Sequence, residues 1–289
     1  MTATNNKFAK PLGVMLYSLL SNTKSASQMI IYIIESDLSP DNKNRLEKVV
    51  VNAGASVKFL TIPQSMYSGL KTRPHLPQET YYRLAIPKLL DKKISKALYL
   101  DGDIIVKNDI TRLWKIKLGD YYVAAVRRPK IPDQVIKRLG ITKKSDYFNA
   151  GVLLMNLKKW REHKISEKIL EFGKKKFLIK FPSQDPMNAV LKGKWLKLNR
   201  KWNYTSTYAR MNPNIDPYII HYSGPDKKPW DNDRHVFRHE YLKYEKELEW
   251  DVLEEANVLT YRPIKRSTIY KRLRRPSSKL AGKKSVRTG

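Results

Sequence analysis

Two carboxylates that lie one residue apart, Asp101 and Asp103, interrupt an otherwise apolar segment at residues 97–106. Burying two carboxylates is costly unless a cation neutralises them. Residues i and i+2 of an extended strand face the same side, so both side chains can reach one ion. Gly102 leaves room between them for a ligand against the backbone. The spacing therefore indicates a divalent-metal site. The alternative is a pair of acids that simply begins a polar loop.

A second Asp-x-Asp pair acts as a control within the chain. Asp231 and Asp233 follow Pro229 and Trp230 in a polar segment, with no predicted strand directly before them. Pro, Asp and Asn are typical turn residues, so we interpret this pair as part of a turn. The strand context, and not the spacing, distinguishes the Asp101 pair.

His221 is our candidate for a third metal ligand, because it closes an apolar run just before a Gly-Pro turn. A lone histidine there is more often structural, and only its combination with the acid pair favours a ligand role. The chain has no cysteine, so carboxylates and histidines must hold any metal, which favours a hard ion, Mn²⁺ or else Mg²⁺. His235 and His239 stand four apart, but Val236 replaces the glutamate of a zinc-protease motif. We expect that pair on a helix surface.

Phosphate-binding loops of the Walker or dinucleotide type do not occur in the sequence. A diphosphate ligand would therefore be neutralised by the metal, by Lys227 or Lys228, and by backbone N–H groups around Gly224. That arrangement would stabilise a departing diphosphate. Either lysine has a simpler alternative as solvated surface, which is the usual environment of a lysine.

The elements that must position these residues alternate between short apolar runs and helical patterns. The run 30–34, a helix that Ser39 caps and that continues to Val51, and the run 57–60 predict a βαβ unit. Further strands are predicted at 97–100, 104–106, 122–126, 152–155 and 218–222, and further helices at 11–20, 81–90, 157–177 and 236–255.

These elements predict an α/β fold with a mostly parallel central sheet flanked by helices. Ligands of such sheets bind beyond the carboxyl ends of the strands, which is where the Asp101 pair would lie. The first strand is the weakest element, because only ten residues, most of them polar, precede the helix at 11–20. We expect the chain to begin partway through a strand.

A chain of 289 residues, 41% of them hydrophobic, can bury the core of one catalytic domain, and we assign that domain to residues 1–255. No stretch approaches the roughly 20 apolar residues that span a bilayer. The start of the sequence lacks the apolar core of a signal peptide. We therefore expect the protein in the cytoplasm.

The chain carries 57 Lys and Arg against 27 Asp and Glu, a net charge of +30, which must attract a polyanion. Residues 256–289 are predicted to form a basic, helical tail, which has no acidic residue. Its eleven cations are Arg262, Lys265, Arg266, Lys271, Arg272, Arg274, Arg275, Lys279, Lys283, Lys284 and Arg287. We expect this tail to anchor the protein to an anionic membrane surface, at the inner face of the cell membrane. A disordered, solubilising tail is the alternative.

Four blocks of the sequence occur in the order found in a known enzyme family. They are Tyr81-Tyr82-Arg83-Leu84, Leu98-Tyr99-Leu100-Asp101-Gly102-Asp103, Phe148 through Asn156, and His221-Tyr222-Ser223-Gly224-Pro225 with Lys228-Pro229-Trp230. The chain thereby resembles glycosyltransferase family 8. This family of retaining enzymes includes glycogenin and the bacterial lipopolysaccharide and lipooligosaccharide α-glucosyl- and α-galactosyltransferases.

The resemblance implies a GT-A fold, the fold of many nucleotide-diphospho-sugar transferases. It implies Mn²⁺ on Asp101, Asp103 and His221. It also implies a UDP-sugar donor whose diphosphate meets the ion and the turn at residues 224–228. These implications agree with the metal site and the phosphate contacts that the residues themselves indicate.

Three further residues take roles from the resemblance. It implies that Arg83 and Asn149 approach the donor sugar and that Gln184 lies beside the anomeric carbon. The structural alternatives are a helix-surface cation for Arg83, a turn former for Asn149, and a first-turn residue behind a Ser183 cap for Gln184. An uncharged glutamine is a weak nucleophile, so we favour front-side attack over double displacement as the route to retention.

The sequence departs from the family pattern at three positions. Asn5, in the segment that ends at Phe8, aligns with the family's uracil-contacting acid, and we expect these two residues at the base. Arg128 and Ser183 stand where the family carries carboxylates that hold donor-sugar hydroxyls. This predicts a donor other than UDP-galactose or UDP-glucose, or weak activity. Arg128 suggests an acidic sugar such as a uronic acid.

We therefore expect a retaining, Mn²⁺-dependent glycosyltransferase that transfers a sugar from a UDP-sugar to a cell-envelope glycan or glycolipid. One alternative is a degenerate family member that binds the sugar nucleotide without turning it over. Another is a nucleic-acid-binding protein, which the positive charge and the 17 tyrosines would support. That alternative leaves Asp101, Asp103 and His221 unexplained, and we expect no nucleic-acid partner.

Overall fold

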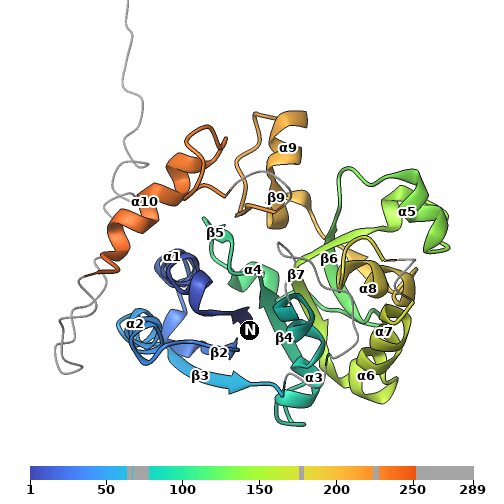
Figure 1. The fold of residues 1–289 in the computed structure, drawn as a ribbon, viewed down its shortest axis with the longest axis horizontal. Coiled ribbons are helices and arrows are strands. Elements are labelled where there is room, and N and C mark those ends of the chain that lie inside the picture. Colours follow the sequence, from blue (N-terminus) through green and yellow to red (C-terminus); the bar gives the residue numbers. More distant parts are fainter. Residues whose placement is uncertain (64–66, 68–77, 176–178, 224–227, 252–289) are drawn as a thin grey trace, which may run out of the picture.

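The computed structural model of the 289-residue chain describes residues 1–63, 67, 78–175, 179–223 and 228–251 (Figure 1). The domain boundary predicted at residue 255 and the basic tail at 256–289 lie outside these ranges, as do Gly224 and Lys227.

The N-terminal segment forms the predicted βαβ unit. Strand β2 (Ile30–Glu35) pairs in parallel with β3 (Ser56–Thr61), and α2 (Pro40–Val51) connects them. Ser39 caps α2 as predicted, because its side chain accepts a hydrogen bond from the backbone N–H of Asn42 at 3.3 Å. Apolar side chains from β2, α2 and α1 (Ala9–Asn22) share one buried core, which holds both helices against the sheet.

The first strand is short but present. Strand β1 (Thr2–Thr4) pairs in parallel with β2, which gives a three-stranded sheet in the order β1-β2-β3. The N–H of Leu100 donates to the carbonyl of Met1 at 3.0 Å, and the Met1 amino group donates to the carbonyl of Leu98 at 2.9 Å. These bonds join the first sheet to β4 (Lys96–Leu100), the strand that leads to Asp101.

The strands around the candidate site form two further sheets of mixed direction. One has the order β4-β7-β6-β8, with β6 (Val123–Arg127), β7 (Phe148–Asn156) and β8 (Trp195–Lys197). The other has the order β5-β10-β9, with β5 (Ile104–Val106), β9 (Tyr204–Thr205) and β10 (Ile219–His221).

Four of the described strand pairs are parallel, and three are antiparallel, namely β4 with β7, β6 with β7, and β5 with β10. The predicted majority of parallel pairs is therefore narrow, and the antiparallel pairs surround the site. The reason is physical: a fully buried strand shows the same continuous apolar run whichever way its neighbour points.

Two predicted helices are interrupted. The segment 81–90 consists of a 3₁₀ helix, η4 (Gln78–Leu84), followed by α3 (Ile86–Leu89), because Pro87 has no N–H to donate and its ring excludes an α-helix through the preceding turn. The described part of the segment 157–177, up to residue 175, divides into α6 (Leu157–Glu162) and α7 (Ile165–Gly173), since Lys164 between them adopts a left-handed conformation with φ of 49°.

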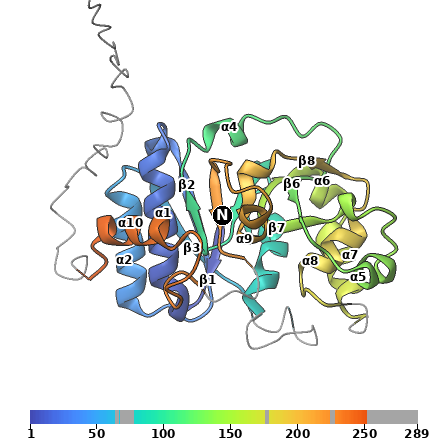
Figure 2. The same ribbon diagram turned by 90° about the horizontal axis from the view of Figure 1, so that it is seen from above.

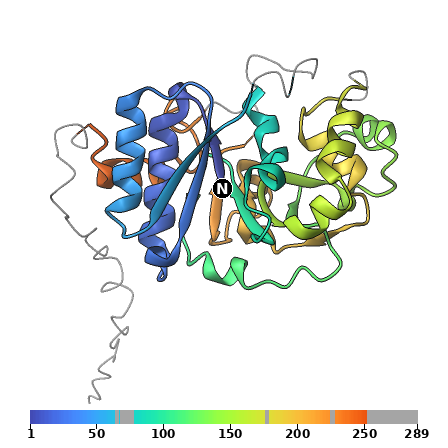
Figure 3. The ribbon, with the colours of Figure 1, turned by 90° about the horizontal axis from the view of Figure 1, so that it is seen from below.

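The other α-helices in the described ranges are α4 (Thr111–Trp114), α5 (Asp133–Arg138), α8 (Gln184–Val190), α9 (Ser206–Met211) and α10 (Arg238–Leu248). In Figures 2 and 3 most strands lie between two groups of helices, one with α1 and α2 and the other with α7 and α8. No helix in these ranges has both the length and the apolar character to cross a bilayer.

Candidate metal centre

Asp101 and Asp103 lie in the connection between β4 and β5, and His221 ends β10. Backbone hydrogen bonds hold this connection to the neighbouring strands. The N–H of Asp101 donates to the carbonyl of Gly151 on β7 at 2.9 Å, and the N–H of Tyr222 donates to the carbonyl of Asp103 at 3.0 Å. Neighbouring strands thus bring His221 next to two carboxylates that are distant from it in the sequence.

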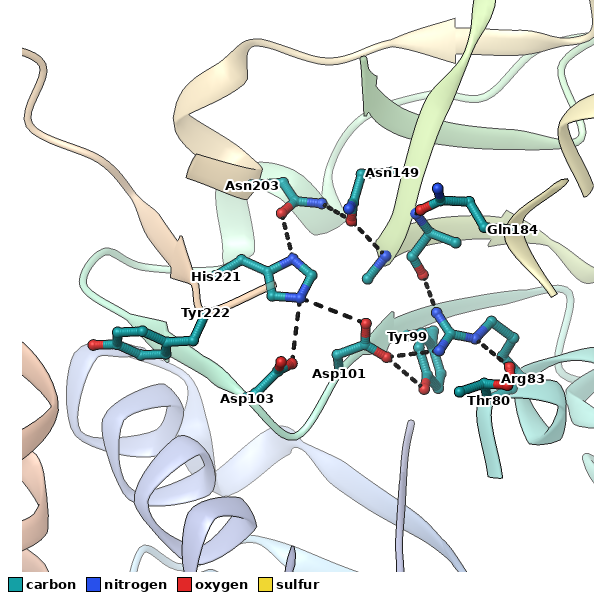
Figure 4. Close-up of polar contacts among 12 residues, drawn as sticks. Thr80, Arg83, Tyr99, Asp101, Asp103, Asn149, Gln184, Asn203, His221 and Tyr222 are labelled. Atoms are coloured by element: carbon teal, nitrogen blue, oxygen red, sulfur yellow. Dashed lines mark hydrogen bonds and ion pairs between the residues drawn. The ribbon is translucent and has the colours of Figure 1, made fainter. Parts of the chain in front are cut away.

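The three side chains face one point (Figure 4). His221 Nε2 lies 3.2 Å from Asp103 Oδ1 and 3.6 Å from Asp101 Oδ2, and one ligand atom from each residue lies within 4.8 Å of the others. A six-coordinate ion with metal–ligand distances of about 2.1 Å holds neighbouring ligand atoms about 3 Å apart. Two carboxylates and an imidazole at these separations fit a hard divalent cation.

Asp101 uses its second oxygen for contacts within the protein. Its Oδ1 accepts hydrogen bonds from Arg83 Nη2 and from the Tyr99 hydroxyl, both at 2.9 Å. Arg83 is buried, donates to two backbone carbonyl groups, and lies with its guanidinium 4.6 Å above the Tyr99 ring. Burial opposes the charge, but Asp101, Tyr99 and Asp103 together outweigh burial and raise the pKa of Arg83. Arg83 is therefore not a helix-surface cation, and it orients Asp101.

Asp103 is held by a cation in the same way. Lys228 Nζ lies 2.6 Å from Asp103 Oδ2 and donates to the carbonyl of Tyr222 at 2.5 Å. Burial alone would raise the pKa of Asp103, but Lys228 and His221 lower it well below its usual value, so the carboxylate is ionised. Lys228 is therefore not solvated surface, because it lies against one of the candidate metal ligands.

A chain of buried amides sets the tautomer of His221 (Figure 4). Asn149 Oδ1 accepts hydrogen bonds from the N–H of Gly151 and from Asn203 Nδ2, both at 2.9 Å. Asn203 Oδ1 consequently faces His221 Nδ1, at 2.7 Å. A backbone N–H can only donate, so it fixes the orientation of both amides and requires a proton on His221 Nδ1. The lone pair of Nε2 is then left for a metal.

Asn203 has no place in the sequence-based predictions. It is completely buried at the end of the 3₁₀ helix η7 (Arg200–Asn203), directly before β9. Its signal in the sequence is weak, a single polar residue between the buried aromatic residues Trp202 and Tyr204. Tyr99, which also contacts the candidate ligand Asp101, stands within one of the family blocks, but the sequence alone does not distinguish it from other strand residues.

Gly151 provides the space in which the ligands meet. A Cβ atom at this position would lie 2.1 Å from His221 Cε1 and 2.6 Å from Asp101 Oδ2, far inside van der Waals contact. A Cβ atom at Gly102 would lie 3.8 Å from Leu12 Cδ1, which is an ordinary contact. The packing of the protein therefore requires glycine at position 151, whereas the sequence pattern drew attention to position 102.

The three residues expected at the donor sugar gather along one segment of β7 (Figure 4). Gln184 begins α8, its Oε1 accepts from the N–H of Ala150 at 3.1 Å, and its Nε2 donates to the Tyr147 hydroxyl at 2.9 Å. Arg83 donates to the carbonyl of the same Ala150, and Asn149 precedes it in the strand. The structure thus brings Gln184, Arg83 and Asn149 to the edge of the candidate metal site.

Asn5 and Phe8 lie directly before α1. Asn5 Oδ1 accepts from the N–H of Phe8 at 3.1 Å, and Asn5 Nδ2 donates to Glu79 Oε1 at 3.2 Å. The ring of Phe8 meets that of Trp230 edge-on, with 6.0 Å between centroids. Glu79 therefore supplies a carboxylate next to the position where the resemblance places a uracil-contacting acid, which the order of the sequence does not reveal.

The predicted position of His235 on a helix surface is wrong. His235 precedes α10 and is buried, with Nε2 3.0 Å from Ser206 Oγ. The N–H of Phe237 donates to its Nδ1 at 3.2 Å, so Nε2 carries the proton and donates to the serine. Ser206 and His235 therefore cannot act as a nucleophile and its general base. His239 lies exposed on α10, and the second Asp-x-Asp pair lies in turns, both as predicted.

Both the sequence and the fold of this chain are similar to those of known proteins. The sequence pattern described as Glycosyl transferase family 8 matches residues 1–234. General stress protein A of Bacillus subtilis (strain 168) is 31% identical over 274 residues, 88% of this chain and 94% of that protein. A lipopolysaccharide 1,2-glucosyltransferase of Escherichia coli (strain K12) is 28% identical over 233 residues, 76% of this chain and 68% of that protein. The crystal structure of the galactosyltransferase LgtC in complex with donor and acceptor sugar analogs has a TM-score of 0.78 at 26% identity, over 86% of this chain and 95% of that chain.

Proposed function

Since the chain belongs to glycosyl transferase family 8 and has the GT-A fold of LgtC, we propose that it is a retaining, Mn²⁺-dependent enzyme. In this proposal it transfers a sugar from a UDP-sugar to a cell-envelope glycan or glycolipid. The family itself implies a nucleotide-sugar donor, a divalent metal and a glycan acceptor. The observation that carries the proposal is the convergence of Asp101, Asp103 and His221 on one point, beside Gln184.

In this proposal four side chains help to neutralise the diphosphate, three through the metal that they hold and one directly. Asp101, Asp103 and His221 hold the metal, which, when bound, supplies positive charge that stabilises the departing diphosphate. Lys228 adds a second cation at the same place, since its ammonium lies against Asp103. The sequence contains no phosphate-binding loop, and in this arrangement the metal and Lys228 would neutralise the phosphates in its place.

Gln184 supports front-side attack as the route to retention. Both ends of its amide are fixed, the oxygen by the N–H of Ala150 and the nitrogen by the Tyr147 hydroxyl. An amide held in this way acts as an oriented dipole and not as a nucleophile. The departing diphosphate would then accept the proton of the attacking hydroxyl on the same face of the sugar.

A UDP-release assay over several UDP-sugars, with Mn²⁺, Mg²⁺ or EDTA, tests the proposal. We expect at least one donor for which Mn²⁺ raises release more than about tenfold over EDTA, because the leaving charge is otherwise poorly stabilised. Asp103→Asn should reduce release to the EDTA level, whereas Asp120→Asn, which changes an exposed carboxylate, should not. Mn²⁺-dependent binding of UDP without release from any donor would instead identify a non-catalytic family member.

The proposal includes residence in the cytoplasm, at the inner face of the cell membrane. The similarity to an Escherichia coli protein named as a lipopolysaccharide glucosyltransferase supports an acceptor of the cell envelope. The eleven cations of the tail support the membrane contact, because each contributes roughly 1 kcal/mol near anionic lipid.

Removal of residues 263–289 is expected to weaken binding to anionic vesicles at least about tenfold, because most of the tail's cations are lost. UDP release from soluble substrates should not change. Sedimentation with phosphatidylglycerol vesicles measures the effect, with phosphatidylcholine vesicles as the control. Equal sedimentation of the full and shortened chains would show that the tail is not the anchor.

A further inference from the structure

Arg128 directly follows β6 and lies beside the start of β7. Its N–H donates to the carbonyl of Tyr147 at 2.9 Å. The side chain is half-buried: the guanidinium lies 4.3 Å above the ring of Phe181, and Nε donates to the carbonyl of Lys130 at 3.2 Å. These two contacts fix the plane of the guanidinium and leave its two terminal nitrogens for another partner.

Within the described ranges, no carboxylate lies at ion-pair distance from Arg128. Asp185 affects it electrostatically, but Asp185 is fully buried and already accepts three hydrogen bonds. These come from the Tyr147 hydroxyl at 2.5 Å and from the N–H groups of Lys180 at 2.6 Å and Phe181 at 2.8 Å. Burial lowers the pKa of Arg128, yet an arginine stays charged in proteins. The guanidinium is therefore a pre-oriented cation that an incoming anion would stabilise.

The order of groups along β7 shows where Arg128 lies relative to the candidate metal site. Gly151 contacts Asp101, and Gln184 bonds to Ala150 at one end of its amide and to Tyr147 at the other. The four residue-to-residue steps from Gly151 back to Tyr147 extend about 13 Å, at about 3.3 Å per step. A donor with its diphosphate at the candidate metal site would therefore have its sugar near Gln184. Groups beyond the point of transfer would lie towards Arg128.

We propose that Arg128 binds a carboxylate or phosphate group of the saccharide substrate, so that this transferase takes an acidic saccharide. The inference rests on the proposed function. The chemistry is a two-pronged hydrogen bond from the guanidinium to an oxyanion, for which arginine is better suited than lysine. The oxyanion belongs either to the transferred sugar, as in a uronic acid, or to the acceptor.

Kinetics with matched neutral and acidic substrates test the inference. One arm compares UDP-glucuronate and UDP-galacturonate with UDP-glucose and UDP-galactose as donors. The other compares uronate-terminated and phosphorylated oligosaccharide acceptors with their neutral counterparts. We expect the wild type to prefer the acidic partner in one arm, which identifies the source of the anion. Arg128→Gln should lower kcat/KM for that partner at least about 30-fold, the loss for a charge pair that the bound saccharide shields from water, and leave kcat/KM for the neutral partner nearly unchanged.

Two further variants sharpen the test. Arg127→Gln removes the same charge from the neighbouring, exposed side chain and should retain the acidic preference. Arg128→Lys keeps the charge but loses the planar fork, so it should retain only part of the preference. A wild type that prefers the neutral partner in both arms, or an Arg128→Gln effect that is equal for both partners, would overturn the inference while UDP release still upholds the proposed function. No UDP release from any donor would overturn both.

Discussion

Gly151→Ala is expected to eliminate metal-dependent sugar transfer in a protein that still folds. The new Cβ atom would lie 2.1 Å from His221 Cε1 and 2.6 Å from Asp101 Oδ2. Strand β7 cannot move aside, because β4 pairs with it on one edge and β6 on the other. The two ligand side chains must therefore move apart. We expect the affinity for Mn²⁺ to fall more than about 100-fold, beyond the effect of losing a group that only orients a ligand.

Titration with Mn²⁺, followed by calorimetry or electron paramagnetic resonance, measures the effect of Gly151→Ala independently of activity, and circular dichroism checks the fold. Gly102→Ala is the matched variant, since its Cβ atom would make only an ordinary contact with Leu12, and it should still bind Mn²⁺. Wild-type Mn²⁺ affinity in Gly151→Ala would mean that Asp101 and His221 do not share an ion.

Asn203→Leu is expected to weaken Mn²⁺ binding about 10–100-fold, the usual effect of removing a group that orients a metal-binding histidine. Leucine has a similar volume but no acceptor for the proton on His221 Nδ1, which Asn203 Oδ1 accepts at 2.7 Å. The imidazole can then take the other tautomer, in which Nε2 carries the proton and cannot bind a metal. Asn149 Oδ1 also loses one of its two donors and keeps only the N–H of Gly151.

Asn203→Asp separates the orienting role of Asn203 from a merely structural one. The aspartate keeps an acceptor for His221 Nδ1 but loses the donor to Asn149, so Mn²⁺ affinity should fall less than in Asn203→Leu. Thermal unfolding of both variants provides the comparison, because a structural role alone would lower stability without a selective loss of metal binding. Equal Mn²⁺ affinity in the two variants would contradict the role assigned to Asn203.

The acid pair and His221 were predictable because a charged or polar residue at the end of an apolar run remains visible in one dimension. The four family blocks gave the GT-A fold, which the similarity to LgtC confirms. The helix that begins after Ser39 was predictable from the same kind of local signal, a capping side chain followed by a proline. Local patterns thus predicted most element positions and the three residues that the fold brings together as a candidate metal site.

The support around the ligands was not predictable, because it depends on which residues face each other across strands. Gly151 and Asn203 act on His221 through contacts that no local pattern records. The antiparallel pairs of β7 escaped prediction for the same reason, since strand direction leaves no trace in a buried apolar run. His235 was wrongly assigned because its spacing from His239 matched a helical turn, although the helix begins only at Arg238.

The charges of the two candidate carboxylate ligands and of the two cations that hold them balance each other. Arg83 lies against Asp101 and Lys228 against Asp103, so these four side chains sum to zero formal charge before any metal binds. A divalent cation that entered alone would leave two uncompensated positive charges among partly buried groups, whereas a nucleoside diphosphate brings the missing negative charge. Metal and donor should therefore bind with positive cooperativity, each raising the affinity of the other by the same factor. The concentration of sugar nucleotide would then set how much of the protein carries a metal ion.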